Sequence, residues 1–136
     1  MQPVQFHQAV EAIVQRDKRF DPAAYLFLKD ALDFTVRRVV EDGGEPRHVT
    51  GQELLAGFRD HALEQFGPMA ATLLREWGVQ ACSDVGDMVF LLIDHGVFGK
   101  QESDTKEDFA GVYDFEEAFV APFLPRRRRA RLASPQ

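Results

Sequence analysis

The stretch LLIDHGVFGKQESDTKEDFAGVYDF, residues 91–115, passes from an apolar, helix-like pattern through a polar insert to alternating aromatic residues. Gly96 is a typical residue at a helix end, and the apolar pieces at 97–98 and 112–115 have the short length of strands. The polar insert at 100–108 is too long for a two-residue turn. These features predict a helix end followed by a small C-terminal β-hairpin whose strands are joined by a loop.

Five segments predict helices, because their apolar residues recur every three or four positions. They lie at about 4–16, 22–42, 51–66, 68–77 and 83–95. Asp21 and Thr50 have the chemistry of helix N-caps, and Ser83 is the expected cap of the last segment. Glu53 would complete a capping box with Thr50. The sequence therefore predicts a mainly α fold of about five helices followed by the hairpin.

The length and composition fit one globular domain. With 136 residues, of which 45% are hydrophobic and 28% charged, the chain can bury one core and is too apolar for intrinsic disorder. We expect the domain to span 1–124 and the Arg-rich residues 125–136 to form a disordered tail. The apolar runs are shorter than the roughly 18 residues that span a membrane, and the N-terminal residues lack a secretory leader pattern. We therefore expect a cytoplasmic protein that does not enter a membrane.

Charge is unevenly distributed along the chain. The net charge is −6, from 16 basic and 22 acidic residues, and no acidic residue follows Glu117. Five of the basic residues lie in the tail: Arg126, Arg127, Arg128, Arg129 and Arg131. Removing these five leaves 11 basic residues against 22 acidic ones, so the body has a net charge of −11. A body of this charge repels nucleic-acid phosphates unless one face is strongly basic.

Two long strings carry a resemblance to a known family. They are RHVTGQELLAGFRDHALEQFGPMAATLLREWGV at 47–79 and DVGDMVFLLIDHGVFGKQESDTKEDFAGVYDFEEAF at 84–119. Over about residues 20–123, the chain resembles an uncharacterised bacterial family of conserved hypothetical proteins, mainly planctomycete and verrucomicrobial. The resemblance implies a bacterial protein and brings no activity, cofactor or catalytic residue with it.

The last predicted helix and the hairpin are similar in architecture to the recognition helix and wing of winged-helix transcription regulators. That resemblance implies a helix in the major groove and basic wing residues on phosphates. We expect the helix instead to expose Asp84, Asp87 and Asp94, and it has no Lys or Arg. The acidic wing, residues 102–117, has seven acidic residues against the single basic residue Lys106. We therefore expect winged-helix order without DNA reading by this surface.

The sequence has few signals of catalytic or metal chemistry. His7, His48, His61 and His95 are far apart and lack the spacing of metal ligands. Cys82, the only cysteine, lies near a helix start, where a thiol is either a small buried residue or an activated nucleophile. We favour the buried residue. We therefore predict no catalytic residue, metal ligand or cofactor, and an enzyme is the least supported class.

Aromatic residues are concentrated at the C-terminal end of the predicted domain. Phe115, Phe119 and Phe123 step by four, so a helix there would place them on one apolar edge that could bind a partner. The alternative is that this segment packs back on the domain. The candidate partner-binding residues are Tyr113, Phe115, Phe119, Phe123, Glu116 and Glu117.

These observations favour a non-enzymatic cytoplasmic protein-interaction or regulatory module that acts through the acidic wing and the aromatic edge. Its partner would be a protein, and a second copy of the chain is one candidate. A continuous cationic groove built from Arg37, Arg38, Arg59 and Arg75 would contradict this hypothesis, because it would make the body a reader of nucleic acid.

Two alternative functions stay open. The first is a nucleic-acid-associated regulator that binds polyanions through the five tail arginines, without sequence specificity and with strong salt dependence. The second is an uncharacterised enzyme. The tail also has two interpretations without nucleic acid: a solubilising end, and a segment that folds back on the acidic wing of its own chain or of a second copy.

Overall fold

The computed structural model describes residues 3–45, 49–99 and 105–125, and within them the fold is mainly α, as the sequence predicts. Five helices, α1 to α5, are followed by the short helix α6, and three 3-10 helices are labelled η1 to η3. The bounds are α1 Pro3–Arg16, α2 Pro22–Glu41, α3 Gly51–Phe66, η1 Gly67–Met69, α4 Ala70–Glu76, α5 Cys82–Asp94, η2 Lys106–Phe109, α6 Phe115–Phe119 and η3 Ala121–Phe123. None of the described helices has the length and apolarity needed to cross a membrane.

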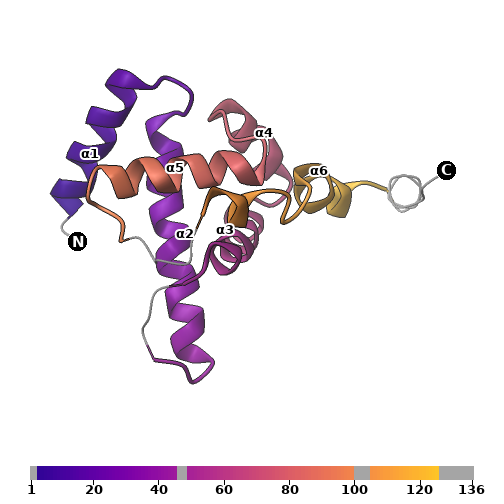
Figure 1. Cartoon of the computed structure of the whole chain (residues 1–136). Coiled ribbons are helices and arrows are strands. Elements are labelled where there is room, and N and C mark those ends of the chain that lie inside the picture. Colours follow the sequence, from indigo (N-terminus) through magenta and orange to yellow (C-terminus); the bar gives the residue numbers. More distant parts are fainter. Residues whose placement is uncertain (1–2, 46–48, 100–104, 126–136) are drawn as a thin grey trace.

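The helices are arranged around α2 and α3, which pack against each other. Figure 1 shows α2 running through the middle of the molecule and α5 crossing it in that view. One end of α5 lies at α1, and the other end lies toward α4 and α6. The first helix and the last helix therefore lie on opposite sides of the molecule.

The N-termini of α2 and α3 are capped as predicted. The Asp21 carboxylate accepts a hydrogen bond from the Ala23 N–H at 2.9 Å. At α3, the Thr50 hydroxyl accepts from the Glu53 N–H at 3.1 Å, and the Glu53 carboxylate accepts from the Thr50 N–H at 2.8 Å. These bonds satisfy backbone donors that a helix start leaves free, so they fix where each helix begins.

The prediction that Ser83 caps α5 is wrong. The helix begins two residues earlier than a Ser83 cap would place it, at Cys82, with Ala81 in the cap position and no side-chain hydrogen bond from that residue. The Asp84 carboxylate, in the first turn, instead accepts a hydrogen bond from the Gln80 N–H at 2.9 Å. An acidic residue of the first turn therefore holds the preceding loop, and Ser83 is exposed.

The core receives side chains from all five longer helices and from the C-terminal segment. Its largest fully buried side chains are Phe6, Ile13, Phe20, Tyr25, Leu28, Leu55, Phe58, Leu74, Met88, Leu92, Phe109 and Phe119. Because Phe109 and Phe119 are among them, residues 105–125 belong to the domain and close one side of its core.

The predicted β-hairpin is wrong for the described residues, none of which forms a strand. The segment after 104 forms η2 and then α6. Thr105 donates its N–H to the Asp108 carboxylate at 2.7 Å, and this bond caps the start of η2. Residues 100–104 of the expected loop lie outside the described residues. The described residues therefore support the mainly α class but not the predicted winged-helix order with its hairpin.

The burial of Phe109 explains why the segment at η2 packs on the helical body instead of forming a strand. Its ring fits against Gly51 at the start of α3 and Gly86 in α5. A Cβ added at these glycines would lie 2.9 and 2.6 Å from Phe109 atoms, closer than packed atoms tolerate. The ring is 2% exposed, so its burial holds η2 on the domain.

The acidic face of α5 is partly neutralised by a residue outside the helix. The two terminal guanidinium nitrogens of Arg19 bind Asp84 at 2.8 Å and Asp87 at 2.9 Å. The third acidic residue, Asp94, is exposed. The expectation that α5 presents three exposed carboxylates is therefore corrected for two of them, because the loop before α2 supplies a cation that the local sequence of α5 lacks.

A candidate interaction cleft

An open cleft of about 670 Å³ lies between α4, the N-terminal end of α5 and the segment that leads into α6. Its walls come from parts of the chain that are separated in the sequence: α4, residues 79–83 and residues 110–120. Helix α6 contacts α4 directly. The packing of the C-terminal segment back onto the helical body therefore creates the cleft.

Three aromatic side chains form one wall of the cleft. The Tyr113 and Phe115 rings stack with centroids 5.8 Å apart, and Phe119 meets them edge-on at 6.2 and 4.9 Å. Phe119 is buried in the core, whereas Tyr113 and Phe115 are half-buried. Because two of the rings keep exposed surface, this wall offers apolar and π contacts to a ligand.

Tyr113 is held in place from α3. Its hydroxyl donates a hydrogen bond to the Leu55 carbonyl oxygen at 2.8 Å, and the Arg59 guanidinium carbon lies 5.6 Å from its ring centroid. Burial raises the pKa of the Tyr113 hydroxyl well above its usual range. The phenol is therefore a neutral donor that ties the cleft wall to α3, and it is poorly suited to act as a general base.

Cys82 is buried against the same wall, as the favoured interpretation of the sequence requires. It is 2% exposed, and its thiol donates to the Tyr113 carbonyl oxygen at 3.3 Å. Burial raises the pKa of the Cys82 thiol and outweighs the backbone hydrogen bonds that lower it. A thiol in this state is a weak nucleophile, even though it is the first residue of α5.

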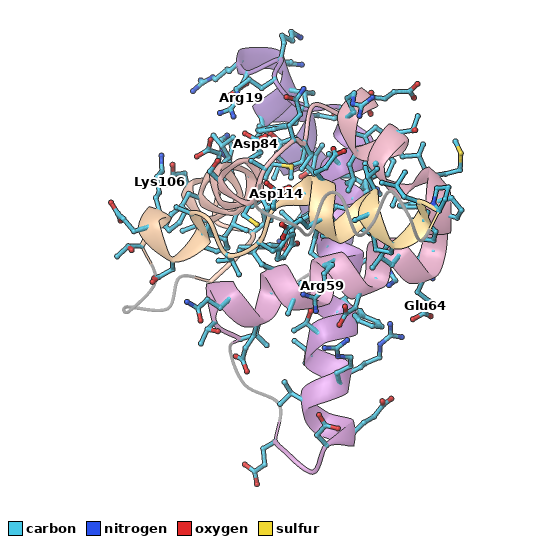
Figure 2. The ribbon with its side chains drawn as sticks, turned by 90° about the vertical axis from the view of Figure 1, so that its right-hand side faces the viewer. Arg19, Arg59, Glu64, Asp84, Lys106 and Asp114 are labelled. Atoms are coloured by element: carbon cyan, nitrogen blue, oxygen red, sulfur yellow. The ribbon has the colours of Figure 1, made fainter. Side chains whose placement is uncertain are left out.

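Acidic residues lie on the α6 side of the cleft. Asp114 caps α6 by accepting a hydrogen bond from the Glu117 N–H at 3.2 Å, and Figure 2 shows it at the start of that helix. Glu116, in the first turn, is exposed. A single basic residue, Arg75, lines the α4 side. The rim formed by Asp114 and Glu116, called the acidic rim from here on, therefore favours cationic groups.

Four of the six candidate partner-binding residues line this cleft. They are Tyr113, Phe115, Glu116 and Phe119. Glu117 is exposed on α6, and Phe123 is 44% exposed in η3. The three phenylalanines do not share one helical edge, because α6 ends at Phe119 and Pro122 lies in η3. The candidate polyanion-binding residues Arg126, Arg127, Arg128, Arg129 and Arg131 lie outside the described residues.

The four body arginines that would have indicated a cationic groove have different environments. Arg38 and Arg59 both bind Asp60, at 2.7 and 3.0 Å. Arg37 lines a separate groove that also contains two carboxylates, and Arg75 lines the cleft. One carboxylate thus neutralises part of the charge of two of these arginines, Arg38 and Arg59.

His61 and Glu64, which lie three residues apart on α3, point in different directions. His61 is buried. Its ring stacks on the Phe27 ring with centroids 5.2 Å apart, and it lies tilted against the Phe34 ring with centroids 4.9 Å apart. Glu64 is exposed and points away from the body in Figure 2. Among residues 3–45, 49–99 and 105–125, no group of three His, Cys, Asp or Glu side chains is placed to hold a metal ion.

Sequence reasoning missed the α4 and α5 sides of the cleft. Arg75, Gln80 and Cys82 line it, but their spacing matches no motif and they meet Tyr113 only through tertiary packing. The chain matches no family model, no curated protein and no solved structure. The function proposed for the chain therefore depends on the geometry of the cleft.

Proposed function

We propose that this protein is a non-enzymatic, cytoplasmic protein-interaction or regulatory module whose cleft binds a short basic segment of a partner protein. The observation that carries the proposal is the cleft wall, in which half-buried Tyr113 and Phe115 lie beside Asp114 and Glu116. The walls of the cleft come from three parts of the chain. Because the cleft is open, an extended segment can contact all of these walls.

The chemistry of the walls defines the partner. Partly exposed aromatic rings bind apolar side chains and guanidinium groups, and carboxylates at a rim favour basic residues. The body's net charge of −11 would steer such a segment toward the protein. The expected partner segment therefore combines Arg with apolar residues. A second copy of this chain also carries such a segment, its own Arg-rich residues.

The state of the titratable groups in the cleft supports a binding role over catalysis. The Cys82 thiol and the Tyr113 hydroxyl both have a pKa raised by burial, and both are engaged in hydrogen bonds to backbone oxygens. A thiol or phenol that acts as a nucleophile or general base near neutral pH needs a lowered pKa or an adjacent base. These two groups therefore support the cleft wall instead of offering reactive atoms.

Fluorescence anisotropy with a labelled peptide of alternating Arg and Leu tests the proposal on the full chain. The variant D114N/E116Q is expected to bind this peptide about three- to tenfold more weakly, because each exposed charge pair contributes little. Asn at position 114 keeps the ability to cap α6. The control variant E64Q/D94N makes the same change in net charge at exposed residues outside the cleft walls, and it should bind like the wild type.

Two results would contradict the proposed function. One is equal binding of a peptide in which Glu replaces every Arg, because the acidic rim would then play no part. The other is an equal loss of affinity in D114N/E116Q and E64Q/D94N, because the effect would then come from net charge and not from the cleft.

The nucleic-acid alternative depends on the five tail arginines alone. If it holds, duplex DNA binding at about 150 mM salt should disappear when all five are changed to Gln, because they supply the phosphate contacts. Binding that survives these changes would make the body itself a nucleic-acid reader. We also propose that the chain belongs to the bacterial family that it resembles, which assigns no activity to the cleft.

A further inference from the structure

We infer that the C-terminal residues 126–136 bind the cleft of their own chain and compete there with the partner segment. This regulatory role rests on the proposed function. Residues 126–136 read RRRRARLASPQ, with five arginines, one leucine and no acidic residue. They therefore have the chemistry of the basic, partly apolar segment that the cleft is proposed to bind.

The C-terminal residues begin close enough to reach the cleft. The described chain ends at Pro125, shortly after α6 and η3, and Figure 1 shows this end on the side of the molecule where α6 lies. The mostly helical path from Asp114 to Pro125 spans at most about 20 Å. An extended segment of eleven residues reaches about 36 Å, at about 3.3 Å per residue. Residues 126–136 are therefore long enough to return along α6 to the acidic rim.

Charge complementarity selects the α6 side of the cleft as the docking position. Asp114 and Glu116 are exposed there, and Glu117 is exposed on α6 outside the cleft lining, whereas Arg75 on the α4 side repels a second guanidinium. An arginine at the acidic rim would also lie near the half-buried rings of Tyr113 and Phe115. Arginine combines both contacts, because its guanidinium pairs with carboxylates and stacks on aromatic rings.

Docking of this kind is weak and reversible, as regulation by competition requires. Exposed charge pairs contribute little, and salt screens them beyond about 8 Å at physiological ionic strength. Tethering compensates, because a short flexible linker gives an effective concentration on the order of 1 mM. For a free segment with a Kd of about 0.1 mM, tethering lowers the apparent affinity for an added segment by about tenfold.

Competition binding on full-length chains tests the inference. The probe is a fluorescein-labelled peptide of residues 126–136, measured by anisotropy at about 50 mM salt. The variant with all five tail arginines changed to Gln is expected to bind the probe about tenfold more tightly than the wild type, because its own C-terminal residues no longer compete. The difference should shrink at about 500 mM salt, where rim charges are screened.

Amide NMR separates docking from a general effect of net charge. Without any peptide, the spectra of the wild type and the five-Gln variant should differ mainly at residues 113–117. Adding the unlabelled 126–136 peptide to the variant should move these resonances toward their wild-type positions. Differences spread evenly over the molecule would overturn the inference, because a change in net charge alone would explain them.

The remaining outcomes distinguish this inference from the proposed function. Equal affinity of the wild type and the five-Gln variant for the probe would overturn the inference and leave the proposed function standing. A probe that binds neither chain would overturn the proposed function. A dimeric mass in light scattering that depends on the tail arginines would place the segment on a second copy, which would also overturn docking within one chain.

Discussion

Tyr25 and Tyr113 are both tyrosines whose hydroxyl pKa is raised by burial, to about 12 for Tyr25 and further for Tyr113. Only Tyr113 has a hydrogen-bond partner among the described residues, the Leu55 carbonyl oxygen. A buried hydroxyl without a partner loses its hydration and gains nothing in exchange, whereas a paired one satisfies two groups at once. The two hydroxyls should therefore respond differently to removal.

Replacing Tyr25 by Phe is expected to leave the free energy of unfolding unchanged or to raise it by up to about 1 kcal/mol. Replacing Tyr113 by Phe should lower it by about 1–2 kcal/mol, because the Leu55 carbonyl oxygen loses its donor. Urea denaturation of both variants measures the difference. A Y25F variant that loses as much stability as Y113F would show that the Tyr25 hydroxyl is paired in solution.

Asp60 links stability to pH. Partial burial pushes the pKa of the Asp60 carboxyl up, but hydrogen bonds from Arg38 and Arg59 outweigh it and hold the pKa below its ordinary value. A carboxyl whose pKa is lowered by folding stabilises the fold above its unfolded pKa of about 3.9. This contribution is lost as the pH falls through the pKa of the folded state.

The Asp60→Asn variant should therefore be about 0.5–1 kcal/mol less stable than the wild type at pH 7, as expected for ion pairs that are only partly buried and screened by solvent. The difference in the free energy of unfolding between the two proteins should close as the pH falls below about 4. Urea denaturation of both proteins at a series of pH values measures this difference. A gap that stays constant down to about pH 2.5 would mean that Asp60 acts through packing and not through its charge.

At the scale of elements, the packing of α2 on α3 depends on a small residue. Gly57 of α3 lies against Thr35 of α2, and a Cβ added at Gly57 would overlap the Thr35 hydroxyl oxygen. Thr35 is buried, and its hydroxyl donates to the Ala31 carbonyl oxygen at 2.7 Å, so it has little freedom to move away. The glycine therefore allows the two helices to approach closely.

The Gly57→Ala variant should lose about 1–3 kcal/mol of stability through overpacking, although alanine is the better helix former by about 1 kcal/mol. The loss should be smaller when Thr35→Ala is also present, because the overlapping hydroxyl is then absent. Thermal denaturation of the single and double variants measures this coupling. A neutral or stabilising Gly57→Ala change would contradict the close packing of α2 and α3.

The elements differ in how far local sequence predicts them. Asp21 and Thr50 cap their helices through bonds to N–H groups two or three residues away, so cap chemistry was visible in the sequence. The hairpin prediction failed because Phe109 packs against Gly51 and Gly86, which belong to α3 and α5. The strand-like pattern at 112–115 carries no information about such distant partners.

At the scale of the whole molecule, the cleft and the charge layout follow from tertiary packing. The aromatic wall was predictable, since Tyr113 and Phe115 lie close in the sequence, but its position opposite α4 was not. The pairing of Arg19 with Asp84 and Asp87 was equally hidden, because Arg19 precedes α2 whereas both aspartates lie on α5. The composition gives the total charge of the chain. Which carboxylates are paired with a cation, as Asp84 and Asp87 are, depends on the fold.

The most direct test of the cleft as a binding site is amide NMR of the full chain during titration with the peptide of alternating Arg and Leu. Binding at the cleft predicts that the largest shifts fall on residues 79–83 and 110–117, which come from separate parts of the chain and share this surface. Shifts centred on the groove around His61 and Arg37, or the absence of shifts at saturating peptide, would contradict it.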